Sequence, residues 1–119
     1  MSNVFTVALG GALGAVCRYL ITLFPMNPES GFPVKTFLIN VAGSFLIGIV
    51  AALAARNALN PRTVLFLKVG ICGGFTTFSS FALETEGLVG KGTGIALWYV
   101  LLSLVCGVLA VYAAEKLVG

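Results

Sequence analysis

The sequence predicts an all-α integral membrane protein with four transmembrane helices. Of its 119 residues, 59% are hydrophobic and only 9% are charged, and the mean hydropathy is +1.07. A soluble domain carries about 25% charged residues. The apolar residues gather in four stretches of roughly 20 residues, long enough to cross a ~30 Å hydrocarbon core as helices. We expect one domain over residues 1–119, with spans at 4–24, 34–55, 63–86 and 95–118.

The first segment, 4–24, carries Gly10 and Gly14 in a G-x-x-x-G pattern, which allows another helix to approach closely. Arg18 lies near the end of this segment, so we expect its guanidinium to extend along the axis to the membrane interface. No Lys/Arg-rich region precedes the apolar run, which favours a retained helix over a cleaved signal.

Polar side chains also occur within the second and fourth segments. A polar group at membrane depth needs a partner, and single hydroxyls usually form hydrogen bonds between helices. Asn40 is more informative, because its amide has two donors and two acceptor lone pairs to satisfy. The hydroxyls of the fourth segment are those of Tyr99, Ser103 and Tyr112.

The third segment contains the most unusual stretch, Gly70 to Phe81, which reads G-I-C-G-G-F-T-T-F-S-S-F. The pair Gly73-Gly74 disfavours a helix, and two β-branched residues, Thr76-Thr77, follow almost at once. These residues predict a break near 73–77. Irregular backbone at membrane depth is tolerated where it lines a cavity or binds an ion. The break therefore indicates a functional site.

Two kinds of ion chemistry suit such a break. Carbonyls freed at Gly73 and Thr76 would form a cation site, as unwound carbonyls do in broken-helix transporters. The rings of Phe75, Phe78 and Phe81 recur at i, i+3 and i+6, which predicts one shared helix face. Ring edges are electropositive. Together with neutral hydrogen-bond donors they attract an anion without holding it, whereas a fixed Lys or Arg beside the path would bind it too long.

The basic residues are almost evenly divided between the two ends of the predicted bundle. Four spans place both termini on one side of the membrane. The basic residues on that side are Arg56, Arg62 and Lys116, with Lys68 slightly inside the membrane. Those on the other side are Lys35, Lys91 and Arg18. The positive-inside rule then gives no clear orientation. Such a chain can insert both ways and pair as an antiparallel dimer. One fixed orientation with a weak signal is the alternative.

Three motifs along the chain are distinctive. The first is G-G-x-x-G-A-x-x-R-Y, from Gly10 to Tyr19. The second is T-x-x-x-N-x-x-G-S-F-x-x-G, from Thr36 to Gly48. The third is G-G-F-T-T-F-S-S-F, from Gly73 to Phe81, followed by Glu84. Through these motifs the whole chain resembles the Fluc (CrcB) family of small bacterial fluoride channels.

The resemblance implies a passive channel that exports fluoride from the cytoplasm and lowers its toxicity. It also implies a dual-topology antiparallel homodimer in the bacterial inner membrane, with two pores and a structural Na⁺ at the dimer centre. Gly73 and Thr76 would bind Na⁺ through backbone carbonyls, and Arg18 would be structural. The implied pore residues are Asn40, Phe78 and Phe81, with Ser79, Ser80, Tyr99 and Ser103 in a polar track beside them.

Other classes of protein fit the residues less well. A small multidrug-type transporter needs a membrane-embedded carboxylate, and we expect Glu29, Glu84, Glu86 and Glu115 to lie at or near segment ends. A non-transporting assembly subunit would use the polar residues only as contacts between helices. The chain has no histidine and no aspartate, so we expect neither an enzyme nor an organic cofactor. No basic cluster suggests nucleic-acid binding.

Overall fold

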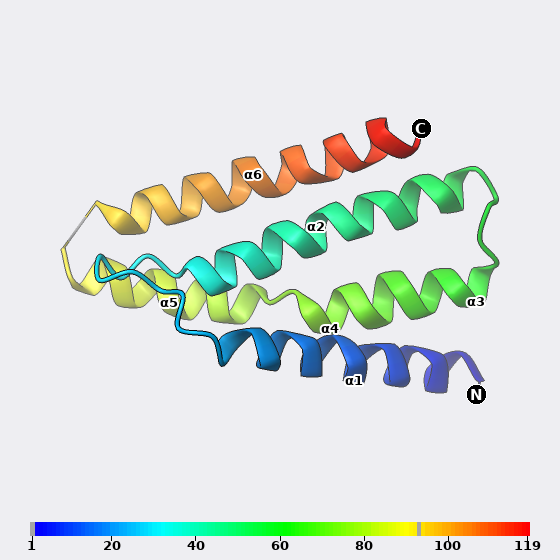
Figure 1. Ribbon diagram of the computed structural model, residues 1–119, viewed down its shortest axis with the longest axis horizontal. Helices are drawn as coiled ribbons and strands as arrows, with labels where there is room; N and C mark the ends of the chain where they lie inside the picture. Colours follow the sequence, from blue (N-terminus) through cyan, green and yellow to red (C-terminus); the bar gives the residue numbers. More distant parts are fainter. Residues whose placement is uncertain (1, 93) are drawn as a thin grey trace.

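A computed structural model describes residues 2–92 and 94–119, and within them four helical spans form an up-down-up-down bundle (Figure 1). These spans are α1 (Ser2–Thr22), α2 (Val34–Ala55), a composite third span (Pro61–Gly90) and α6 (Ile95–Val118). Each is long and apolar enough to cross a membrane. The spans α2 and α6 coincide with the expected ranges 34–55 and 95–118. The first starts and ends earlier than 4–24, and the third extends beyond 63–86.

The third span consists of four consecutive pieces: α3 (Pro61–Val64), the π-helix η1 (Leu65–Cys72), α4 (Gly73–Phe75) and α5 (Phe78–Gly90). Its start follows ordinary capping rules, with Pro61 at the first helical turn and Asn60 Oδ1 accepting from Thr63 N–H at 2.9 Å. The π-helix was not expected from the sequence. Such segments are rare and frequently occur at functional sites.

The bundle is flat rather than round, with extents of 48 × 30 × 21 Å. Figure 1 shows α6, α2, the third span and α1 side by side in that order, with the start of α1 and the end of α6 at the same end of the molecule. The contacts agree, because α2 packs mainly on α6 and α1 packs mainly on η1 and α4. A flat arrangement leaves many large apolar side chains of α1 and α6 exposed, as expected of surfaces that meet lipid or another protein.

Glycines set the close crossing of α1 with the third span. A Cβ added to Gly10 would lie 2.9 Å from the Gly70 Cα, and one added to Gly14 would collide with the Ile71 carbonyl oxygen. A Cβ on Gly74 would strike the Gly11 carbonyl oxygen. The expectation that the G-x-x-x-G pair allows close helix approach is therefore confirmed, and the third span contributes matching glycines.

A buried apolar cluster closes one end of the bundle. Leu88, Ala96 and Tyr99 form its centre, and Phe32, Phe37, Phe81 and Ile95 pack around them. The Tyr99 ring lies against Phe32 and Phe81, with centroid separations of 5.4 and 5.0 Å. This cluster fixes α5 against α6 and so positions the residues that follow the break.

Candidate functional site

The third span is broken at Thr76 and Thr77, between α4 and α5 (Figure 1). Both residues have extended backbones, with φ/ψ of −81°/157° and −148°/114°. A break was expected near 73–77, but the glycine pair itself stays helical in α4. The reason is packing, since α1 lies so close to Gly74 that a Cβ there would strike the Gly11 carbonyl oxygen. The two β-branched residues, rather than the glycines, leave the helix.

Asn40 of α2 holds the broken backbone through both ends of its amide. Its Oδ1 accepts from Thr77 N–H at 2.8 Å, and its Nδ2 donates to the Thr77 carbonyl at 3.1 Å. One side chain therefore replaces two partners that a continuous helix would have supplied. The second Nδ2 hydrogen has no protein acceptor among the described residues, so it is free to donate to a bound group.

The hydroxyls that follow the break organise the start of α5. Thr77 Oγ1 accepts from Ser80 N–H at 3.1 Å and lies 3.3 Å from Ser79 Oγ. This is an ordinary N-cap, which orients the positive end of the α5 dipole toward the break. Ser79 is exposed and Ser80 is half-buried, and neither lines the pocket described below.

The end of α4 presents carbonyl oxygens whose usual partners are engaged elsewhere. Thr77 N–H, the α-helical partner of the Gly73 carbonyl, donates to Asn40. Ser80 N–H, the partner of the Thr76 carbonyl, donates to Thr77 Oγ1. The Gly74 carbonyl accepts instead from Arg18 Nε at 3.1 Å. The expectation that Arg18 extends to the interface was wrong, because its guanidinium turns toward the break.

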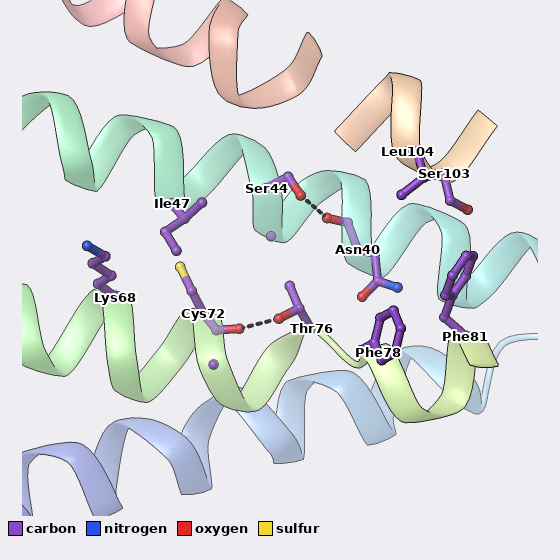
Figure 2. Close-up of a pocket in the computed structure, with 12 residues that line it drawn as sticks. Asn40, Ser44, Ile47, Lys68, Cys72, Thr76, Phe78, Phe81, Ser103 and Leu104 are labelled. Atoms are coloured by element: carbon purple, nitrogen blue, oxygen red, sulfur yellow. Dashed lines mark hydrogen bonds between the residues drawn. The ribbon is translucent and has the colours of Figure 1, made fainter. Parts of the chain in front are cut away.

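A pocket of about 330 Å³ lies beside the break. Figure 2 shows Asn40, Phe78 and Phe81 toward one end of it and Lys68 at the other. Gly73 and Thr76 also line it, so the pocket is lined by both expected cation ligands and by some of the expected anion ligands. The complete lining is Asn40, Gly43, Ser44, Ile47, Lys68, Cys72, Gly73, Thr76, Phe78, Phe81, Ser103 and Leu104.

The aromatic residues divide at the break. Phe78 and Phe81 belong to α5, with ring centroids 5.8 Å apart at an interplanar angle of 47°. Phe75 belongs to α4, so the expected single helix face for the three rings was wrong. Phe78 is 77% exposed, whereas Phe81 packs on the buried Tyr99 ring. The Phe78 ring is therefore available to a bound ion or a second chain.

Ser103 and Tyr99 of α6 lie in different surroundings. The Ser103 hydroxyl is buried and lacks a hydrogen-bond partner within the described residues, although the side chain lines the pocket. An orphaned buried hydroxyl is rare and indicates a missing partner such as a water or an ion. The Tyr99 hydroxyl instead donates to Glu84 Oε1 at 2.9 Å and is absent from the pocket lining.

The position of Glu84 within the third span was not predicted from the sequence. It is half-buried in the middle of α5, not near a segment end, and its Oε2 accepts from Thr36 Oγ1 at 2.9 Å. The signal was present, because Glu84 follows Phe81 by three residues and Thr36 precedes Asn40 by four, which places each pair on one helix face. Both carboxylate oxygens accept hydrogen bonds from neutral hydroxyls.

Comparison with known proteins covers almost the whole chain. Residues 5–115 match the family model described as CrcB-like protein, Camphor Resistance (CrcB). Three relatives are each named fluoride-specific ion channel FluC. The Agrobacterium fabrum protein is 45% identical, covering 98% of this chain and 96% of its own length. The Shewanella pealeana protein is 42% identical (99% and 97%), and the Chlorobaculum tepidum protein 43% (98% and 94%).

These relatives are named as channels, not enzymes, and the four spans describe a multi-pass membrane protein. The matched range, residues 5–115, includes the broken span, Asn40 and the glycines of the helix crossing. The chain therefore belongs to the CrcB (FluC) family.

Proposed function

We propose that this chain is a passive fluoride-selective channel that releases fluoride from the cytoplasm across the bacterial inner membrane. The observation that supports this most strongly is the break at Thr76–Thr77, held by Asn40 beside the rings of Phe78 and Phe81. The fluoride specificity in the names of the relatives supports the choice of ion.

Fluoride is small and strongly hydrated, so a selective path must replace its water donors one by one. The pocket offers the free Nδ2 hydrogen of Asn40, the unpartnered Ser103 hydroxyl and the ring edges of Phe78 and Phe81. All of these are neutral, so each binds weakly enough for the ion to leave, as conduction requires. Ser79 and Ser80 at the start of α5, and Tyr99 beside Glu84, would extend this polar path.

A structural Na⁺ fits the carbonyls that end α4. Gly73 is exposed, and a Cβ there would meet nothing closer than the Lys68 carbonyl oxygen at 4.0 Å, so its surroundings are open. Within the described residues no cluster of three or more His, Cys, Asp or Glu side chains could hold a metal. Backbone oxygens of Gly73 and Thr76 are then the appropriate ligands. Bound there, Na⁺ would supply positive charge that fixes the ends of the broken helix.

Two carbonyls from one chain leave such an ion incompletely coordinated. A second, antiparallel copy would supply two more and would cover the exposed Phe78 ring. We propose this dual-topology homodimer, with two pores, because the flat bundle leaves many large apolar side chains exposed and the charges give no preferred orientation. Arg18 would be a structural residue that stabilises the broken span by donating to the Gly74 carbonyl.

The physiological role follows from acid–base chemistry. HF crosses membranes as a neutral molecule and dissociates inside the cell. A negative-inside potential then drives fluoride outward by ~2.3 kcal/mol per charge per 100 mV. A passive channel therefore lowers cytoplasmic fluoride without another energy source.

One observation favours the alternative of a small multidrug-type transporter: the half-buried Glu84 is a carboxylate within the third span. Both of its oxygens are already bonded to Thr36 and Tyr99, however, which leaves little capacity for an organic cation. Reconstitution in liposomes separates the two functions. We expect fluoride efflux, followed with a fluoride electrode, to exceed chloride efflux greatly. Equal rates, or proton-coupled export of an organic cation, would refute the channel.

A further inference from the structure

Lys68 is the single charged residue among those that line the pocket. It lies on the π-helix η1, is exposed, and makes no hydrogen bond or ion pair within residues 2–92 and 94–119. Its ammonium group is therefore not neutralised by a nearby carboxylate. Such a charge, at the edge of a cavity with apolar walls, acts on any ion that enters.

The backbone of η1 aligns Lys68 with the rest of the pocket. In a regular α-helix, residues eight apart drift by roughly 80° around the axis. The wider π-helix has more residues per turn and turns less per residue, which offsets that drift. Lys68, Cys72 and Thr76 consequently all line the same pocket (Figure 2). The π-helix thus provides a physical reason why Lys68 lies on the pocket side.

We propose that Lys68 is an electrostatic concentrator for the anion. It would raise the local fluoride concentration at the pocket without binding fluoride tightly, and this proposal rests on the proposed channel function. The axial separation from Thr76 is at most about 12 Å, which is eight residues at the α-helical rise of 1.5 Å, because a π-helix rises less per residue. At that distance a unit charge enriches a monovalent anion about twofold in water and about tenfold at an effective dielectric constant near 20.

This role is compatible with a path of neutral ligands. Asn40, Phe78 and Phe81 lie toward the opposite end of the pocket from Lys68, so the ion meets the charge and the selective donors at different places (Figure 2). The lysine stem is flexible, and no hydrogen bond within the described residues holds the ammonium group in one place. Attraction at this end of the pocket therefore does not become the tight retention that a fixed cation beside the donors would cause.

The test compares Lys68→Gln, which removes the charge, with Lys68→Arg, which keeps it. Lys116→Gln is the matched control, because Lys116 is an exposed lysine near the end of α6 and does not line the pocket. Each protein is reconstituted in neutral liposomes, and initial fluoride efflux is measured at subsaturating fluoride. Ionic strength is set with potassium gluconate at about 0.01 M or 1 M, where the Debye length is about 30 Å or 3 Å.

We expect Lys68→Gln to lower the flux about two- to tenfold at low ionic strength and to match the wild type at high ionic strength. Lys68→Arg and Lys116→Gln should follow the wild type at both. The proposal is overturned if Lys68→Gln leaves the low-salt flux unchanged, or if its deficit persists at high salt, which would indicate a structural effect. Absence of fluoride flux from the wild type would instead refute the channel function itself.

Discussion

Substitution of Asn40 tests the proposed site most directly, because its side-chain amide alone bonds both backbone groups of Thr77. In Asn40→Ala the Thr77 N–H and C=O lose their partners. A buried group left without a hydrogen bond costs about 1–3 kcal/mol, so two such groups cost about 2–6 kcal/mol. Thr77 is only half-buried, and water entering the pocket recovers part of this. We expect a net cost of about 2–3 kcal/mol.

This free-energy cost destabilises the conformation in which the broken span lies beside the pocket. It corresponds to about a 30- to 140-fold change in the equilibrium constant between the intact and the disrupted break. The substitution also removes the Nδ2 hydrogen proposed to meet fluoride. We therefore expect fluoride flux to fall by at least tenfold.

The assay is fluoride efflux from liposomes that contain equal amounts of each variant, with size-exclusion chromatography to check assembly. Thr85→Ala is the matched control, since it removes one hydroxyl that bonds the Phe81 carbonyl within α5 and lies outside the pocket beside the break. It should retain near-wild-type flux. If Asn40→Ala conducts like Thr85→Ala, Asn40 neither supports the break nor meets the ion, and the reasoning fails.

Three further predictions concern the rings, the helix crossing and the half-buried carboxylate of Glu84. Phe78→Ile should cut fluoride flux sharply because it removes an aromatic ring edge from the pocket, while an apolar side chain of similar bulk keeps the assembly intact in size-exclusion chromatography; unchanged flux would show that the ring has no role in conduction. Gly14→Ala should destabilise the protein by about 1–3 kcal/mol in thermal melts, since its Cβ would collide with the third span. Gly87→Ala, which meets nothing within 4 Å, should stabilise it by about 0.4–1 kcal/mol, and equal shifts would contradict the packing argument. Tyr99→Phe should cost about 1–3 kcal/mol by leaving Glu84 Oε1 without its donor, and an unchanged melting temperature would show that water replaces the hydroxyl.

Sequence patterns were sufficient for features that depend on composition or on local chemistry. Hydropathy located α2 and α6 at their observed bounds, because segments of this length and apolarity have few alternatives to a helix. The G-x-x-x-G pair in α1 identified a close crossing, since small residues serve that purpose in membranes. The break was also located to within a few residues.

Features that depend on tertiary partners could not be predicted in the same way. The residues that leave the helix are Thr76 and Thr77, because Asn40 compensates their backbone while α1 holds Gly74 in helical form. No pattern within the third span encodes that choice. The turn of Arg18 toward Gly74 likewise requires knowing that α1 packs on α4.

The geometry of the break would allow one short segment to bind the two ions of opposite charge proposed above. The end of α4 presents carbonyl oxygens, and the start of α5 presents N–H groups and the positive end of its dipole. In a continuous helix these groups would bond to each other and neither would be available. Asn40 satisfies the pair at the junction, so the break costs little while the groups on either side remain oriented. A cation at Gly73 and Thr76 and an anion near Phe78 would therefore stabilise opposite ends of the same interruption, and loss of either ion should weaken binding of the other.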